Sequence, residues 1–309
     1  RRLPVTDLQR AGGYGVYYHF DYVGAPRNYK WINTNQIEKI WQQMDLAYQR
    51  GARQLWVVNV GDIKPMEYPL SFFLKMAWNP QAMTSGALAA YPRQWAQASF
   101  GAANAARIGE LITRYSMLVA RRKPELVDQD TFALGEGAPA KLDGGEFGAI
   151  VAEWQALEQR MLGVKASLPA EHRDAYYQLI EYPIAAVSNL YQLYYAAAWN
   201  KRLAARNDAR ANHFADLVQM RFERDKALTQ HYHAINGGKW DGMMQQVHMS
   251  YVNWNEPTQQ SMPSISRVGG DTLPGRSAHS IAFAPAAPQT PGVIPIEAPM
   301  FARVTANKG

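Results

Sequence analysis

The chain has no cysteine among its 309 residues, which excludes disulfide bonds and thiolate metal sites. It also lacks any run near the roughly 18 apolar residues that a membrane-spanning helix needs, so we expect no membrane segment. Charged residues make up 19% and hydrophobic residues 47%, as in an ordinary globular protein. No signal peptide and no initiator methionine open the chain, which starts Arg1-Arg2-Leu3-Pro4, so we expect any targeting segment to lie upstream.

The net charge of +6 does not predict nucleic-acid binding, because the basic residues are spread out and form no single patch. Their densest cluster, Arg121-Arg122-Lys123, precedes a proline at an expected helix end, where the helix dipole favours cations. A basic protein would also suit an anionic small substrate such as a uronic acid. The 9 Trp and 17 Tyr are typical of sugar-binding proteins and equally of large helical cores.

The N-terminal part has the pattern of a β-α-β unit. Dense β-formers predict one strand from Tyr14 to Phe20 and another from Gln54 to Val60. Between them, apolar residues recur at helical spacing, with Asn35 and Glu38 as a capping box and Gly51 as the C-terminal cap. We therefore expect two parallel strands joined by a right-handed crossover.

Polar side chains follow both expected strands at their carboxyl ends, where α/β folds carry their chemistry. The second strand contains the continuous apolar run Leu55–Val58, which is typical of a strand buried on both faces. The polar residues that follow it are Asn59, Asp62, Lys64 and Glu67. Those at the end of the first strand and in the loop beyond it are His19, Asp21, Tyr22, Arg27 and Trp31.

From about residue 100 the apolar period becomes 3.6 and stays so, which predicts four or five long helices with short links, as in a helix bundle. Pro183 should kink or split one of them. After Gly237-Gly238 the chain is expected to be extended, and beyond residue 255 it is rich in Pro, Ser and Ala. Two strands with helices neither close a barrel nor form a stable open sheet, so we expect further strands upstream of Arg1.

Several motifs, in their order along residues 1–265, resemble glycoside hydrolase family 115. They are Gly12 to Trp31, Trp56 to Glu67, Ala77-Trp-Asn-Pro80, Glu181-Tyr-Pro183, Gly238 to Met244 and Tyr251 to Pro257. The resemblance implies an α/β part plus an all-α part: the last β/α units of a catalytic (β/α)8 barrel at 1–98 and a four- to five-helix bundle at 99–236. It implies an extended, Pro-rich linker, or the start of a C-terminal β domain, at 237–309.

The resemblance also implies a function. Enzymes of this family are inverting glycoside hydrolases that remove glucuronic acid, often 4-O-methylated, from its α-1,2 linkage to xylose in glucuronoxylan. The implied partner is glucuronoxylan or its oligosaccharides, with no cofactor or metal, and the implied location is secreted or periplasmic. We expect the chain to be inactive alone, without the earlier barrel strands. The alternative is a non-catalytic helical module that packs against the barrel or forms a homodimer.

An inverting glycosidase needs a carboxylic acid and a carboxylate roughly 6.5–9.5 Å apart. The candidate catalytic residues are Asp62, Glu67 and Asp21. Asp62 ranks first because it is nearest a strand's carboxyl end, and its alternative role is a turn-former or a partner of Lys64. Glu67 could instead cap the next helix.

The candidate substrate-binding residues are His19, Tyr22, Arg27, Trp31, Asn59 and Lys64. Arg27 offers a bidentate fork and Lys64 a point charge to a uronate carboxylate, although both could instead pair with Asp21 or Asp62. His19 could hydrogen-bond a sugar hydroxyl or serve as a structural hydrogen-bonder. Tyr22 and Trp31 could flank a sugar ring or pack the loop.

Overall fold

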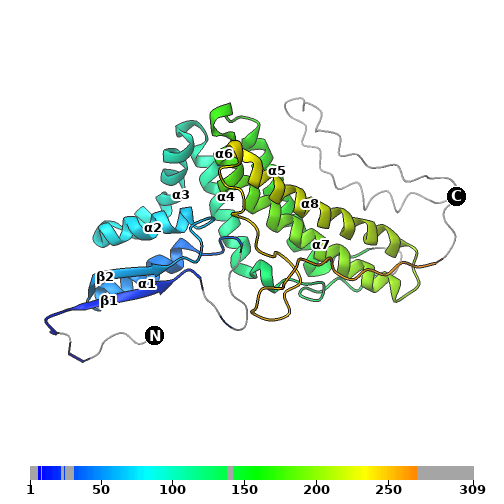
Figure 1. Ribbon diagram of the computed structural model, residues 1–309, viewed down its shortest axis with the longest axis horizontal. Helices are drawn as coiled ribbons and strands as arrows, with labels where there is room; N and C mark the ends of the chain where they lie inside the picture. Colours follow the sequence, from blue (N-terminus) through cyan, green and yellow to red (C-terminus); the bar gives the residue numbers. More distant parts are fainter. Residues whose placement is uncertain (1–5, 8, 22–23, 25–30, 138–141, 270–309) are drawn as a thin grey trace.

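A computed structural model describes residues 6–7, 9–21, 24, 31–137 and 142–269 (Figure 1). Its strands and α-helices follow the order β1(Tyr14–His19), α1(Ile37–Gln49), β2(Ala52–Asn59), α2(Glu67–Trp78), α3(Ser85–Phe100), α4(Ala102–Arg121), α5(Gly145–Lys165), α6(Arg173–Tyr176), α7(Tyr182–Ala204) and α8(Arg210–Gly238). Single 3-10 turns are η1(Pro80–Ala82), η2(Pro124–Leu126) and η3(Ala170–His172), and η4(Tyr177–Glu181) is a π-helical turn.

The predicted β-α-β unit is confirmed. β1 pairs with β2 in parallel, and the register runs from Gly15 opposite Leu55 to His19 opposite Asn59. α1 connects the two strands (Figure 1). Because the strands are parallel and in this register, their carboxyl ends lie side by side, at His19 and Asn59.

Burial of β2 on both faces was predicted and is wrong for the described residues. Trp56 and Val58 pack against the apolar cluster of α1 and α2. Leu55 and Val57 alternate with them and are 63% and 42% exposed. Side chains of a strand alternate between its faces, and the described helices cover only one face of this two-stranded sheet.

The start of α1 differs from the predicted capping box. The helix begins at Ile37, and no side chain caps it. The Asn35 amide instead donates to Asn33 Oδ1 at 3.2 Å and lies 3.4 Å from Met66 Sδ, so one local and one tertiary contact engage this side chain in place of a cap. The other end is as predicted: Gly51 has φ +90° and donates its N–H to Tyr48 O at 3.0 Å.

The second part of the chain is helical, as predicted from its apolar period. α4 packs on α5, α5 on α7, and α7 on α8 (Figure 1). The sequence did not predict α3, which Thr84 caps by accepting the N–H of Ala87. The expected domain boundary at 98/99 falls inside this helix. Gly101, with φ +79°, turns the chain from α3 into α4.

A kink or split was predicted at Pro183, and the helix expected over residues 176–199 does depart from regular α-helical geometry just before it, without a break in the helical backbone. The π-helical turn η4 precedes α7, whose second residue is Pro183. Proline is tolerated there because the first helical turn leaves its N–H groups unpaired in any case. Most of α7 is buried, so it is the central helix of this part.

The chain beyond α8 returns toward the N-terminal unit. Non-helical dihedral angles at Ile235, Asn236 and Gly237 end the regular helix, which agrees with the predicted break. Residues 240–269 are irregular and pass α4 before running along α7 (Figure 1). Asn200 and Asn212 each hold this segment with two hydrogen bonds, to the backbone of Ser266 and of Val268 respectively.

Two apolar cores result, one among α1, α2, β1 and β2 and a larger one among the later helices. Tyr68 and Trp95 pack against both cores and connect them. Trp31 and Ile32 come from the N-terminal unit yet belong to the larger core. None of the helices in the described ranges is long and apolar enough to cross a lipid bilayer.

Candidate functional site

The paired strand ends bring three predicted site residues together. Asn59 Nδ2 lies 3.3 Å from His19 Nδ1 and 3.4 Å from the carbonyl oxygen of Asp21. The Asn59 carbonyl in turn accepts the backbone N–H of Phe20 at 2.8 Å and of Asp21 at 3.3 Å. The amide of Asn59 therefore joins the two strand ends and orients the start of the loop that follows β1.

Gly61 brings Asp21 next to the turn after β2. A Cβ atom on Gly61 would lie 3.1 Å from Asp21 Oδ2, and the Gly61 backbone has φ +65°. The Gly61 N–H donates to Asn59 Oδ1 at 3.1 Å, which closes the turn. Asp62, the next residue, is exposed, and its Oδ2 accepts a hydrogen bond from Gln246 Nε2 at 2.8 Å.

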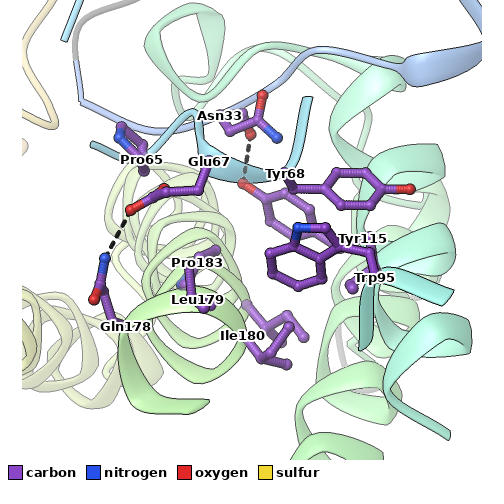
Figure 2. A pocket seen from close by; sticks show the side chains of 12 residues that line it. Asn33, Pro65, Glu67, Tyr68, Trp95, Tyr115, Gln178, Leu179, Ile180 and Pro183 are labelled. Atoms are coloured by element: carbon purple, nitrogen blue, oxygen red, sulfur yellow. Dashed lines mark hydrogen bonds between the residues drawn. The ribbon is translucent and has the colours of Figure 1, made fainter. Parts of the chain in front are cut away.

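Lys64 and Glu67 form a second group, in which Glu67 points toward Gln178 of the helical part (Figure 2). Lys64 Nζ lies 2.6 Å from Glu67 Oε1, and the two side chains are 16% and 21% exposed. Gln178 of η4 donates to the same Glu67 oxygen at 2.7 Å. The Lys64 ammonium also lies 4.0 Å from the ring centroid of Trp240, a cation–π contact. These contacts satisfy both charges within the protein.

A small cavity of about 40 Å³ adjoins Glu67 between α2, α4 and α7 (Figure 2). Its polar lining is Asn33, Glu67, Tyr68, Trp95, Tyr115 and Gln178. Tyr115 donates its hydroxyl to Asn33 O at 2.8 Å, and burial raises its pKa well above the usual value. Burial likewise raises the pKa of Tyr68, so both phenols stay protonated at neutral pH. Of the predicted site residues that the structure describes, Glu67 alone lines this cavity.

Lys123, at the end of a helix in the sequence pattern, adds a cation near the strand ends. Burial lowers the pKa of Lys123, while the carboxylates of Glu125 and Asp21 oppose that effect. The coupling of Lys123 to Asp21 indicates that the residue just beyond α4 lies within electrostatic reach of the loop after β1. A positive charge therefore lies close to one of the candidate catalytic carboxylates.

The remaining predicted residues have different outcomes. Tyr22 and Arg27 lie outside the described residues. Trp31 is 1% exposed and stacks on His248, with ring centroids 3.8 Å apart and planes at 24°. One face of its ring is thus covered by protein. This favours the packing role that the sequence left open for Trp31 over contact with a sugar.

Sequence reasoning missed three residues that contact the predicted site, Gln178, Trp240 and Gln246, and a fourth, Lys123, that is electrostatically coupled to it. Asp62 and Gln246 are 184 positions apart, so no local pattern could associate them. The only signal was that Trp240 lies within one of the motifs that carried the family resemblance. The helical part and the returning segment therefore supply neighbours to the strand-end residues.

Comparisons with known proteins support the resemblance. Residues 1–126 match glycosyl hydrolase family 115. No curated protein compared with the chain matches it. Among solved structures, the chain is similar to BtGH115A, a family GH115 4-O-methyl-α-glucuronidase described as specific for decorated arabinogalactans. The two share 26% identity with a TM-score of 0.68, and the match covers 86% of this chain but 35% of that one. The chain thus spans about a third of the length of this relative.

Proposed function

We propose that this chain, whose residues 1–126 match glycosyl hydrolase family 115, forms part of an α-glucuronidase. The reaction is removal of glucuronic acid, with or without its 4-O-methyl group, from its α-1,2 linkage to xylose in glucuronoxylan, with inversion at the anomeric carbon. Catalysis requires further strands of a (β/α)8 barrel, so the chain is inactive alone. Such an enzyme would work outside the cytoplasm, secreted or periplasmic, where its polysaccharide substrate is found.

One observation carries this proposal: polar residues of the family-matched region meet where two parallel strands end. His19, Asp21 and Asn59 lie in one hydrogen-bonded group, and Gly61 packs on Asp21. Carboxyl ends of parallel strands are where barrel enzymes place catalytic side chains. Acid–base hydrolysis of a sugar uses carboxyl groups, and the amide and imidazole beside Asp21 are groups that can hydrogen-bond sugar hydroxyls.

Asp62 is the first candidate for a carboxylate that acts on the glycosidic bond or on the attacking water. It is exposed and accepts a hydrogen bond from the neutral amide of Gln246, and no cation among the described residues forms an ion pair with it. Asp21, packed against Gly61, is a candidate for the second carboxylate. Glu67 is a weaker candidate because Lys64 and Gln178 already bind its Oε1 atom.

Cations and hydroxyl partners for the uronic acid come from several elements. Arg27 would bind the uronate carboxylate with its planar fork. Lys123 lies near Asp21 and adds positive charge at the same edge of the sheet. Lys64 would have to exchange its contact with Glu67 for the substrate. His19, Asn59 and Tyr22 would hydrogen-bond the sugar hydroxyls, and we assign Trp31 to packing.

A second substrate class follows from the solved relative, which is described as specific for decorated arabinogalactans. Terminal glucuronic acid on a galactan presents the same carboxylate and ring hydroxyls as on xylan. Only the sugar to which it is attached differs. The strand-end residues proposed here would bind the uronic acid, so they serve either polymer.

The test measures uronic acid released from glucuronoxylan and from glucuronosylated arabinogalactan. It compares the chain itself with a protein extended at its N-terminus by the remaining barrel strands. In the extended protein, Asp62→Asn should lower kcat by about 10²–10⁴-fold, the usual contribution of an acid–base group. Asp130→Asn is the matched control, because Asp130 is an exposed aspartate that pairs with Lys201 in the helical part.

Each outcome decides one part of the proposal. Inactivity of the extended protein on every glucuronosyl substrate would reject the enzyme and favour a non-catalytic module for packing or homodimerisation. Near-normal turnover by Asp62→Asn would remove Asp62 from the site. The anomeric form of the first product, followed by NMR, tests inversion. Activity of the chain alone would contradict its dependence on further strands.

A further inference from the structure

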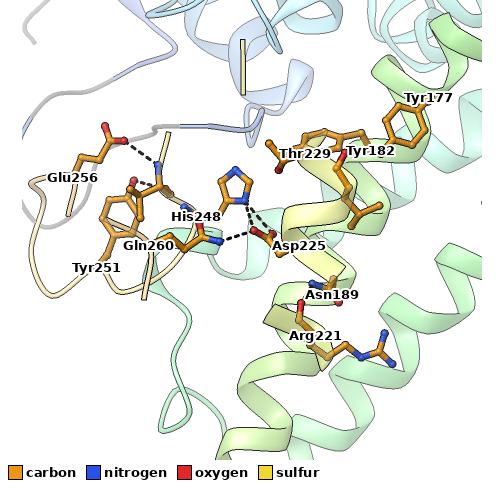
Figure 3. Close-up of polar contacts among 12 residues, drawn as sticks. Tyr177, Tyr182, Asn189, Arg221, Asp225, Thr229, His248, Tyr251, Glu256 and Gln260 are labelled. Carbon is orange, nitrogen blue, oxygen red and sulfur yellow. Dashed lines mark hydrogen bonds and ion pairs between the residues drawn. The ribbon is translucent and has the colours of Figure 1, made fainter. Parts of the chain in front are cut away.

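A buried polar cluster joins α8 to the segment that follows it (Figure 3). Asp225 of α8 and His248 are each 2% exposed. His248 Nδ1 lies 3.0 and 2.9 Å from the two Asp225 carboxylate oxygens and donates to them, since an ionised carboxylate only accepts. Gln260 donates to Asp225 Oδ2 at 2.7 Å and accepts the backbone N–H of His248 at 2.9 Å. The imidazole is therefore held in one orientation.

His248 reaches the candidate site in two ways. Its ring stacks on Trp31, two residues before Asn33, which lines the cavity beside Glu67. Its backbone lies two residues after Gln246, whose amide donates to Asp62 at 2.8 Å. His248 thus links α8 to the segment that leads into α1 through its ring, and to the candidate carboxylate Asp62 through the neighbouring residue Gln246.

The chemistry of the pair argues for a role beyond packing. Taking a carboxylate and an imidazole out of water is costly, and an apolar pair of similar size would fill the same space without that cost. What a buried hydrogen-bonded pair adds is a defined geometry. Asp225 receives two directed donors, from His248 and Gln260, and so sets the angle of the ring against Trp31.

We propose that Asp225 and His248 are positioning residues for the α-glucuronidase site. Asp225 orients His248, and His248 keeps Trp31 and the Gln246 segment in place, so that Asp62 stays at the edge of the sheet. This inference rests on the proposed function, and it gives the helical part a direct role in turnover. Neither residue contacts the proposed reacting groups, so their effect should be on kcat more than on KM.

The test substitutes Asp225→Asn and His248→Phe. The aromatic ring of Phe keeps the contact with Trp31 and removes the hydrogen bond to Asp225. In the N-terminally extended protein, each variant should lower kcat about tenfold with KM unchanged within twofold, since small misplacements of catalytic groups reduce the rate strongly. In the chain itself, hydrogen exchange should increase at residues 31–35 and 59–64.

Glu158→Gln is the matched control. Glu158 is a buried carboxylate of α5 that binds Ser188 of α7 and Arg224 of α8. It should change thermal stability without the selective loss of kcat. The proposal is overturned if Glu158→Gln loses as much kcat as a test variant whose Tm falls by the same amount. It is also overturned if hydrogen exchange at residues 59–64 is unchanged in both test variants. If one test variant does not fold, it is replaced by His248→Gln, which places an amide N–H donor near Asp225. If no uronide is hydrolysed, the proposed function fails, while hydrogen exchange still decides the positioning role.

Discussion

At the end of β2, a single glycine allows the turn and the neighbouring carboxylate to lie together. Gly61 has φ +65°, and a methyl group there would lie 3.1–3.2 Å from the Asp21 side chain. Gly61→Ala should therefore lower the free energy of unfolding by about 2 kcal/mol, from backbone strain together with displacement of Asp21. Chemical denaturation measures this change.

Gly51→Ala is the control that separates backbone strain from displacement of a neighbouring side chain. Gly51 has φ +90°, but a Cβ atom there would meet open space. The backbone cost alone should be about 1 kcal/mol. If both substitutions have the same effect, the contact between Gly61 and Asp21 contributes nothing, and the two strand ends are less closely coupled than we infer.

A charged pair at the start of α8 predicts a dependence of stability on pH. The Arg210 guanidinium, which hydrogen-bonds Asp208, holds the pKa of this carboxyl below its usual value. The ionised Asp208 carboxylate therefore stabilises the folded state fully above its unfolded pKa of about 3.9. This stabilisation is lost as the pH falls through the lower pKa that Asp208 has in the folded state. Asp208→Asn keeps an oxygen for the Arg210 N–H but removes the charge, so it should cost about 0.5–1 kcal/mol at pH 7.

Thermal unfolding of both proteins from pH 7 to pH 3 measures this prediction. The difference in Tm between wild type and Asp208→Asn should be constant near neutral pH and shrink below about pH 4. Asp216→Asn is the control, because its pair with Arg267 is 62% and 50% exposed and should contribute little. A difference that persists unchanged at pH 3 would contradict a charge effect.

At the scale of elements, α3 packs closely against α4 at Gly109. A Cβ atom there would lie 2.9 Å from the backbone nitrogen of Arg93 and 3.2 Å from the carbonyl carbon of Pro92. Backbone atoms of α3 cannot move aside cheaply, so Gly109→Ala should destabilise the protein by about 2 kcal/mol. Gly163→Ala, exposed on α5, should instead stabilise it by about 0.5–1 kcal/mol through helix propensity.

Equilibrium denaturation of this pair checks whether α3 belongs to the packed helical part. Equal effects of the two alanines would mean that α3 lies further from α4 than described. The sequence did not predict α3, whose apolar residues are interrupted by Pro92 and whose helical state depends on burial of Tyr91, Ala96 and Phe100. Tertiary packing here outweighs a weak local signal.

For the whole molecule, the two apolar cores should unfold together because shared aromatic residues connect them. Trp95 packs on both cores, with its ring centroid 5.3 Å from that of Tyr68. Trp95→Ala should reduce stability by about 3 kcal/mol and broaden or split the single transition expected in calorimetry. Trp78→Ala, at a side chain that is 92% exposed, should stay within about 0.5 kcal/mol of wild type.

The strands and most long helices could be predicted because their signals are local. Alternation, apolar period and turn residues reflect the geometry of a few consecutive peptide units. The strand-end residues His19, Asp21 and Asn59 could be associated for a related reason, since adjacent parallel strands end at one edge. The capping box at Asn35 failed because Asn33 and Met66 offered that side chain other partners.

The sequence by itself determined a parallel β-α-β unit followed by long helices, together with polar residues at the strand ends. Only the tertiary structure decided that Lys64 and Glu67 are engaged by Gln178 and Trp240, that Gln246 binds Asp62, and that Trp31 is buried on His248. The physical reason is the length scale. Local patterns depend on backbone geometry over a few residues. These contacts instead depend on how the larger core packs, because that packing fixes the path of the chain after α8.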